Sequence, residues 1–321
     1  MPVFPKPAFP YAVEVTAEKQ RLTAHRKKRK LPSRTPDTLL LGTWNIANLG
    51  AQARDNPHRE LLAHVLGWFD AVAIQECRDN IGDLYDIVDR MGSRFRVVMS
   101  DVAGNNERMV YVYDAKKLTL LDEVGEIALP PSELRHITIA DVDQEFIGFD
   151  RNPYLAAFQL NQSRLSVQLV NVHSFFGSEN DAADLERRAL EAKAVARWVH
   201  LRSKSPYAGA REIVALGDFN MPKPKRAGGT LNYGALTDKG LVLPPHSTEV
   251  GSSIASDNQY DQVAMLASTT QEWMVDIGVF DFDDVIFPDL WTGRGEKDFK
   301  AYLRYYISDH RPLWVRLAPR E

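Results

Sequence analysis

The sequence predicts an α/β protein in which two β-sheets pack face to face and helices cover their outer faces. Three observations support this prediction. Ten short runs are rich in β-branched and aromatic residues, only two segments have a convincing helical pattern, and no internal repeat is present. So many strands with so few helices favour two stacked sheets over a single doubly wound parallel sheet.

The expected strands are short apolar runs bounded by polar or turn residues. Branched and aromatic side chains dominate them, as in "MVYVYD" and "PLWVRL". They cover residues 38–46, 70–76, 94–100, 108–114, 117–124, 154–160, 164–173, 212–218, 261–266 and 311–317.

Two helices are expected, over residues 57–69 and from about residue 181 to 202. In the second, Asp181 supplies an acidic start, which suits the positive end of the helix dipole. Its apolar residues recur at helical spacing, at Leu185, Ala189, Ala192, Ala196 and Val199.

The chain divides into a short N-terminal segment and one large domain. Residues 1–37 are rich in proline and hold nine Lys or Arg against three Asp or Glu, whereas residues 38–321 hold 30 against 40. No composition shift marks a second boundary, so residues 38–321 are expected to form a single domain. The densest positive charge, "HRKKRK" at residues 25–30, is typical of a solvated helix face or loose arm, and alternatively of a phosphate-backbone contact.

Composition excludes several classes of protein. No apolar run approaches the roughly 18 residues of a membrane span, and prolines interrupt the start where a secretory signal would be continuously apolar. We therefore expect no membrane partner and a cytoplasmic location, with export left open. The single cysteine, Cys77, cannot form an internal disulfide and excludes a cysteine-ligated zinc site.

Residues that bind metal ions or phosphate lie where six segments begin or end. One polar residue after an apolar strand is ordinary, because every strand must lead into a loop. Here they recur, and together they supply the parts needed for metal-assisted cleavage of a phosphate ester. They are Asn45, Glu76, His173, Asp218, Asn220, Asp261, Asp309 and His310.

The acids and the last histidine have chemistry suited to such a reaction. Glu76 and Asp309 are hard oxygen donors that suit Mg²⁺, which takes only one or two carboxylates from a protein. His310 can accept a proton from water near neutral pH. A carboxylate at its other ring nitrogen would fix the tautomer, and Asp261 is expected to be that carboxylate.

The stretch "ALGDFNM", residues 215–221, ends a strand with two polar residues. Side chains alternate along an extended chain, so Asp218 and Asn220 would face the same side. One could exchange a proton while the other, like Asn45, bonds a phosphate oxygen without adding charge. Gly217 permits a turn or a close backbone approach. The alternative is that the two residues simply open a turn before the following proline.

Six short motifs, "TWNI", "IQE", "NVH", "GDFN", "YDQV" and "SDHRPLWV", occur in this order over residues 40–317. With them the chain resembles the endonuclease/exonuclease/phosphatase superfamily, and within it the deoxyribonuclease I-like branch. The resemblance covers nearly all of the chain after the basic segment. It implies a four-layer α/β sandwich with two mostly antiparallel sheets, and a catalytic domain over residues 38–321.

The resemblance also implies a role for each matching residue. His310 matches the catalytic histidine, Asp261 the aspartate that orients it, and His173 the second histidine of deoxyribonuclease-like members. Asp218 and Asn220 match the pair that handles a proton and the phosphoryl oxygens. The family's metal-binding residues are matched by Glu76, Asp309 and Asn45. Its phosphate-contacting residues are matched by Asn45, Asn220, Arg108 and Arg151.

These roles imply phosphodiester cleavage with Mg²⁺ as cofactor, or Mn²⁺ in its place. In this hypothesis the metal neutralises charge on the phosphate and His310 removes a proton from the attacking water. In-line displacement then leaves 5′-phosphate and 3′-hydroxyl ends. The expected enzyme is an endonuclease, and its expected partner is a nucleic acid, DNA or RNA.

Two alternatives stay open. A small-molecule phosphodiesterase or phosphatase on the same fold is favoured by the acidic balance of residues 38–321. A non-catalytic binding module would be expected to lack at least one of four residues that are all present, namely Glu76, Asp218, Asp309 and His310. Inositol phosphatases are disfavoured, because they carry a cysteine next to the aspartate that Asp261 matches. The oligomeric state stays open.

Two aromatic stretches bear on the substrate. The segment 289–310 is rich in Tyr, Trp, Arg and Lys. It is either a loop that grips a nucleic-acid backbone or an ordinary surface helix before the last strand. Phe175 and Phe176, shortly after His173, are expected in the core rather than on an exposed apolar hairpin.

Overall fold

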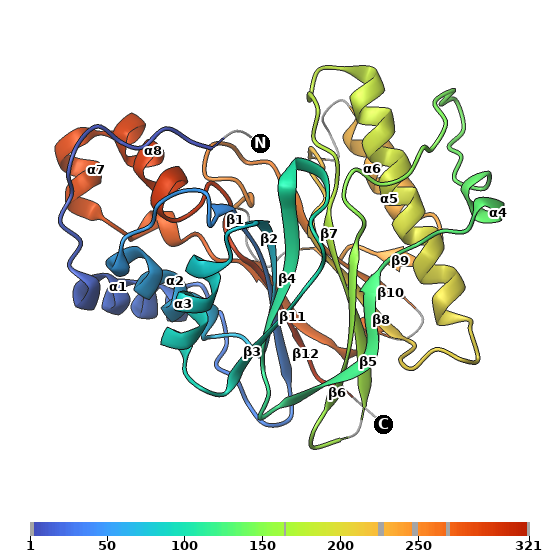
Figure 1. The fold of residues 1–321 in the computed structure, drawn as a ribbon, viewed down its shortest axis with the longest axis horizontal. Coiled ribbons are helices and arrows are strands. Elements are labelled where there is room, and N and C mark those ends of the chain that lie inside the picture. Colours follow the sequence, from blue (N-terminus) through green and yellow to red (C-terminus); the bar gives the residue numbers. More distant parts are fainter. Residues whose placement is uncertain (1–2, 164, 224–227, 246–249, 268–269, 320–321) are drawn as a thin grey trace.

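Two six-stranded sheets pack face to face in the computed structural model, which describes residues 3–163, 165–223, 228–245, 250–267 and 270–319 (Figure 1). The first sheet contains, in spatial order, β11 (Met274–Val279), β12 (Leu313–Leu317), β1 (Leu39–Leu49), β2 (Ala71–Arg78), β4 (Glu107–Asp114) and β3 (Phe95–Met99). The second contains β5 (Leu118–Glu126), β6 (Tyr154–Leu160), β7 (Ser166–His173), β8 (Glu212–Asp218), β10 (Asp261–Leu266) and β9 (Leu241–Val242).

The strand pairing is mostly antiparallel, as predicted. Within the described strands, β1–β2 and β7–β8 pair in parallel, and the remaining ladders are antiparallel. Helices cover both outer faces (Figure 1). The predicted four-layer α/β sandwich is therefore confirmed.

The helices fall into two groups (Figure 1). Beside the first sheet lie α1 (Val15–Lys28), α2 (Asn56–Leu66), α3 (Gly82–Met91), α7 (Pro288–Arg294) and α8 (Glu296–Tyr306). Beside the second lie α5 (Ala182–Ser203), α6 (Gly229–Thr237) and the short α4 (Pro131–Leu134). Three 3₁₀ turns complete the described structure, at Gly104–Asn106, Thr270–Trp273 and Phe282–Asp284. No helix in the described ranges is both long enough and apolar enough to cross a membrane.

Three apolar layers hold the sandwich together. One lies between the sheets, and the others lie under the helices on either side. A sheet covered on both faces buries both sets of alternating side chains, which explains why β1 is buried along its whole length. The strands therefore appear in the sequence as continuous apolar runs.

Both expected helices are present, as α2 and α5. The side chain of Asp181 caps α5 by accepting a hydrogen bond from the backbone N–H of Asp184 at 3.1 Å. Helix α3 and strand β11 were not predicted. Helix α3 is only ten residues long, and Asp276 and Gly278 interrupt the apolar run of β11, so each pattern is too short or too broken to stand out.

The segment 289–310 contains α7 and α8, so the surface-helix alternative is the one observed. Tyr302, Tyr305 and Tyr306 are buried in the core under the first sheet. Trp291 is half exposed. The prediction that these tyrosines grip a nucleic acid is therefore wrong. Helix α8 is amphipathic, and its apolar face points these rings into the core.

The basic stretch 25–30 belongs to the end of α1 and the residues after it. Cations near a helix C-terminus interact favourably with the helix dipole. His25 Nε2 lies 2.7 Å from Oδ1 of the buried Asp281, and Arg29 also pairs with Asp281. Lys27, Lys28 and Lys30 are exposed. The stretch is thus a solvated helix face that is docked on the domain.

Candidate active site

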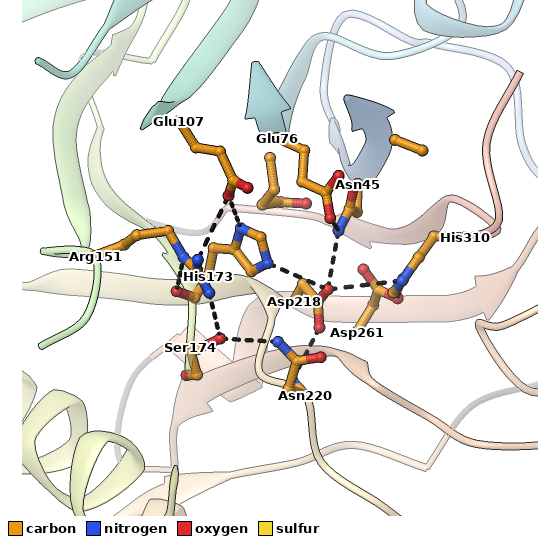
Figure 2. Close-up of polar contacts among 12 residues, drawn as sticks. Asn45, Glu76, Glu107, Arg151, His173, Ser174, Asp218, Asn220, Asp261 and His310 are labelled. Atoms are coloured by element: carbon orange, nitrogen blue, oxygen red, sulfur yellow. Dashed lines mark hydrogen bonds and ion pairs between the residues drawn. The ribbon is translucent and has the colours of Figure 1, made fainter. Parts of the chain in front are cut away.

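Most of the predicted site residues come from both sheets and lie close together (Figure 2). Asn45 in β1 joins the two sheets. Its side-chain nitrogen donates hydrogen bonds to Oε1 of Glu76 in β2 and to Oδ2 of Asp218 in β8, each at 3.0 Å. Since β1 and β8 lie in different sheets, this amide fixes the distance between the two halves of the site.

Glu76 is held in an unusual backbone conformation. Its φ is +60°, and the pairing of β2 with β4 is irregular between Ile74 and Cys77. A non-glycine residue in the left-handed region costs about 1–3 kcal/mol and persists only where the surroundings hold it. The backbone N–H of Asn48 donates to Oε2 of Glu76 at 3.0 Å. The strand irregularity therefore aims this carboxylate into the site.

His310 forms the pair with Asp261 that the sequence predicts. Its Nδ1 lies 2.8 Å from Oδ2 of Asp261, and its Nε2 lies 3.7 Å from Oδ2 of Asp218. Burial acts to lower the pKa of His310, but the attraction of Asp261 and Asp218 outweighs it and raises that pKa well above its usual value. Burial raises the pKa of Asp261 to about 6. The proton between them therefore belongs on the imidazole.

Ser308 positions the loop that carries His310. Its hydroxyl donates to the backbone oxygen of Asn45 at 2.6 Å and accepts the N–H of His310 at 2.9 Å. The indole of Trp44 donates to the His310 carbonyl at 2.8 Å. These contacts tie His310 to β1, the strand that also carries Asn45.

His173 occupies the opposite side of Asp218 (Figure 2). Its Nε2 also lies 3.7 Å from Oδ2 of Asp218, and its Nδ1 lies 3.1 Å from Oε2 of Glu107. Burial favours the protonated form of Glu107, but His173 and Arg151 outweigh it and lower its pKa to about 2. The two imidazoles therefore flank one aspartate, and each is backed by its own carboxylate.

Arg108 is predicted from the sequence as a phosphate contact, and its neighbour Glu107 is not singled out. Neighbouring residues on a strand face opposite sides, so only one of the two can enter the site. Arg108 instead pairs with Asp79 at 3.1 Å and Asp101 at 3.5 Å, both of which are highly exposed. The structure thus places Arg108 outside the cluster.

Arg151 does lie in the cluster. It donates to the backbone oxygens of His173 and Ser174 at 3.0 and 2.8 Å, and Nη1 lies 3.6 Å from Glu107. It is 3% exposed. Arg151 therefore braces the His173 side of the site.

Asn220 reaches the site by a turn rather than by strand alternation. Strand β8 ends at Asp218, and Asn220 has a φ of +51°. Its N–H donates to Oδ1 of Asp218 at 2.9 Å, and its side chain donates to the Ser174 carbonyl at 2.8 Å. Gly217 has a φ of +144°, and a Cβ there would lie 2.0 Å from the Val172 carbonyl oxygen. The close backbone approach expected of Gly217 is present.

Asp309, Asn45 and Glu76 form a group that fits a divalent cation. Oδ1 of Asp309 and Oδ1 of Asn45 are buried and have no hydrogen-bond partner among the residues that the structure describes. Burial raises the pKa of Asp309; Glu76 adds to this rise while His310 opposes it. Hard oxygen atoms left unpartnered beside a second carboxylate are suitable ligands for Mg²⁺ or Mn²⁺.

A second close group consists of Asp218, Asp261 and His310, whose potential ligand atoms lie within 4.8 Å of one another. In this group Asp261 and His310 already bind each other through Nδ1. Proton transfer explains this arrangement better than metal binding, because a metal at Nδ1 would displace that hydrogen bond.

Comparison with solved structures supports the fold. An endonuclease/exonuclease/phosphatase family protein from Bacteroides thetaiotaomicron has a TM-score of 0.58 at 15% identity, covering 87% of this chain and 94% of that one. The mannosyl-6-phosphatase Bt3783 from Bacteroides thetaiotaomicron VPI-5482 has 0.57 at 15%, covering 86% and 98%. D. rerio TDP2 complexed with a single-strand DNA product has 0.55 at 14%, covering 87% and 98%.

No protein-family profile matches the chain, and no curated protein matches its sequence. The structural similarity nevertheless extends over most of each chain. The molecule has the fold of the endonuclease/exonuclease/phosphatase proteins, which is the fold its six motifs predict.

Proposed function

We propose that this protein is a metal-dependent hydrolase of phosphoester bonds, and that it acts as an endonuclease on DNA or RNA. The observation that supports this proposal is the pair of buried imidazole–carboxylate units on either side of Asp218, next to unpartnered metal-binding oxygens. Water attack on a phosphate needs a base, a group at the phosphate or leaving oxygen, and a positive charge. The two imidazoles suit the first two roles, and Glu76, Asp309 and Asn45 would hold a cation that supplies the third.

The reaction begins at His310. In the neutral form of His310, Asp261 holds the Nδ1 hydrogen and Nε2 accepts a proton from the attacking water. On the other side of Asp218, Nε2 of His173 interacts with a phosphate oxygen or the leaving oxygen. The carboxamide of Asn220 bonds a phosphoryl oxygen, and the carboxylate of Asp218 stabilises the imidazolium that forms when His310 takes the proton. In-line attack breaks the bond between phosphorus and the 3′ oxygen, which takes up a proton from water, and leaves 5′-phosphate and 3′-hydroxyl ends.

Glu76, Asp309 and Asn45 would hold Mg²⁺, or Mn²⁺ in its place. When bound there, the cation supplies positive charge that neutralises the phosphate oxygens. Asn45 is then both a ligand and, through Asp218, a link to the imidazoles.

A second candidate function is hydrolysis of a small phosphate ester. It is favoured by carboxylates that already pair with the cations near the site, as Asp79 and Asp101 do with Arg108, and Asp150 with Arg151 and Arg187. A long polyanion would have to compete with these ion pairs. A non-catalytic binding module is the weakest candidate, because every proposed catalytic residue is present.

A substrate panel tests the proposal. Supercoiled plasmid, single-stranded DNA, RNA and bis-p-nitrophenyl phosphate are incubated with Mg²⁺, with Mn²⁺ and with EDTA. Nicking or strand cleavage that needs the metal supports the endonuclease. Activity confined to the small ester supports the second candidate, and no metal-dependent hydrolysis of any substrate would contradict the proposed function.

A further inference from the structure

A small cavity opens beside His173. Its volume is about 220 Å³, and its lining includes Asn105, Arg151, Phe175 and Phe176. The two phenylalanines were expected in the core, but both are only half-buried. The expectation is wrong, because both residues lie on the connection between β7 and α5 rather than within a strand or helix.

The loop that carries these rings is held rigidly. Oε1 and Oε2 of the buried Glu191 accept the backbone N–H groups of Asp150 and Phe175, each at 2.9 Å. Arg188 donates to the Phe176 carbonyl. Gly177 has a φ of +56°, and a Cβ there would lie 2.4 Å from the Asp184 side chain. These contacts fix the backbone that carries the two rings.

Phe175 is one of the residues that line the cavity. The guanidinium of Arg187 lies 3.9 Å from the centroid of the Phe175 ring. Arg187 is not among the described residues that line the cavity. The phenylalanine is thus supported from one side and borders the cavity. Such a ring, fixed beside a reacting phosphate, is a stacking platform.

The charge around the cavity favours an uncharged occupant over a second phosphate. Nη1 of Arg151 lies 3.1 Å from Asp150 and 3.6 Å from Glu107, and Arg187 lies 3.3 Å from Asp150. Both guanidinium groups are therefore already paired. Asn105 adds a carboxamide, which offers a donor and an acceptor to the edge of a planar ring.

We propose that this cavity is a nucleobase subsite, in which the base next to the cleaved phosphate packs on Phe175. The inference rests on the proposed hydrolase function and specifies its substrate class. A cavity of this size takes one base and not a base pair, so the base must be unpaired when it enters. The protein should therefore prefer single strands, or bases that leave a duplex easily.

The test uses a single-stranded DNA oligonucleotide with one cleavable phosphodiester, the other linkages being methylphosphonates. Matched substrates carry a tetrahydrofuran abasic residue on either side of that bond. On the substrate with both bases, Phe175→Ala should lower kcat/KM about 10-fold or more, because removing one stacking partner has an effect of this size. The same loss is expected on the abasic substrate that keeps the base contacting Phe175. On the other abasic substrate Phe175→Ala should have no effect. Phe175→Trp should retain activity, and Tyr207→Ala, at an exposed ring after α5, is the control.

A binding measurement separates this inference from the proposed function. In EDTA, the fluorescence of 2-aminopurine placed beside the phosphodiester should be quenched by the wild-type protein and not by Phe175→Ala. Quenching without cleavage would support the subsite while contradicting the hydrolase. Cleavage with equal losses on base-bearing and abasic substrates, or with no loss at all, would overturn the subsite and leave the hydrolase standing.

Discussion

The two imidazoles beside Asp218 occupy matching positions in different electrostatic surroundings. Each Nε2 lies 3.7 Å from the same Asp218 oxygen, and each Nδ1 faces a buried carboxylate. Glu107 has Arg151 nearby and a pKa lowered to about 2, whereas burial raises the pKa of Asp261 to about 6. The carboxylate on the His173 side is therefore held in its ionised form more strongly than the carboxylate on the His310 side.

The largest expected effect comes from removing the base. His310→Ala should lower kcat about 10²- to 10⁴-fold with Mg²⁺ present, which is the contribution of a positioned general base. Steady-state kinetics on the best substrate of the panel measures it. His136→Ala, at an exposed histidine, is the matched control. Near-normal turnover by a folded His310→Ala variant would show that the imidazole is not the base.

Removing a metal ligand should change the metal requirement more than the maximal rate. Glu76→Gln keeps the shape of the side chain and removes its charge, so the Mg²⁺ concentration for half-maximal activity should rise at least about 10-fold. A magnesium titration of kcat/KM checks this. An unchanged titration curve would contradict the ligand role, and Glu126→Gln on β5 serves as the control.

The carboxylates of Asp261 and Glu107, which pair with the two imidazoles, should not contribute equally to kcat. Asp261→Asn should lower kcat about 100-fold with little change in KM, because the base loses its tautomer and orientation. Glu107→Gln should lower kcat by only about 10-fold, because the amide can still form a hydrogen bond with Nδ1 of His173. Equal losses would mean that the two sides are functionally alike and would remove the distinction between them.

The smallest expected effect is on stability and concerns Glu107 alone. Its folded pKa is about 2, below the usual value of 4.5, so its stabilisation is present above about pH 4.5 and is lost as the pH falls toward 2. Urea unfolding should show the wild type more stable than Glu107→Gln by about 2–4 kcal/mol at pH 6, with the gap narrowing at pH 3. A gap that is constant across this range would contradict the shifted pKa.

The fold and much of the site follow from local patterns in the sequence. Glu76, Asp261 and His310 end or begin recognisable strands, so their motifs mark them individually. Glu107 is different, because it stands next to Arg108 and only the register of β4, with Cys77 opposite Arg108, decides which of the two enters the site. That register depends on long-range pairing, which no local pattern specifies.

Two further features depend on backbone conformation rather than on residue type. Strand alternation predicts that Asn220 faces the site together with Asp218. Asn220 does face the site, but a turn with a positive φ after the end of β8 places it there. Phe175 and Phe176 look like core residues by composition, but the turn at Gly177 leaves them at the rim. Such positions are set by the packing of α5 against the loop.

The central claim is that His310 and His173 act on one phosphate from the two sides of Asp218. A double-mutant cycle on kcat/KM tests it most directly, with His310→Ala, His173→Ala and the double variant assayed in Mg²⁺. Residues that act as a unit give non-additive effects, so the double variant should be little worse than His310→Ala alone. Losses that multiply fully, or a His173→Ala variant with wild-type kcat/KM, would contradict the account.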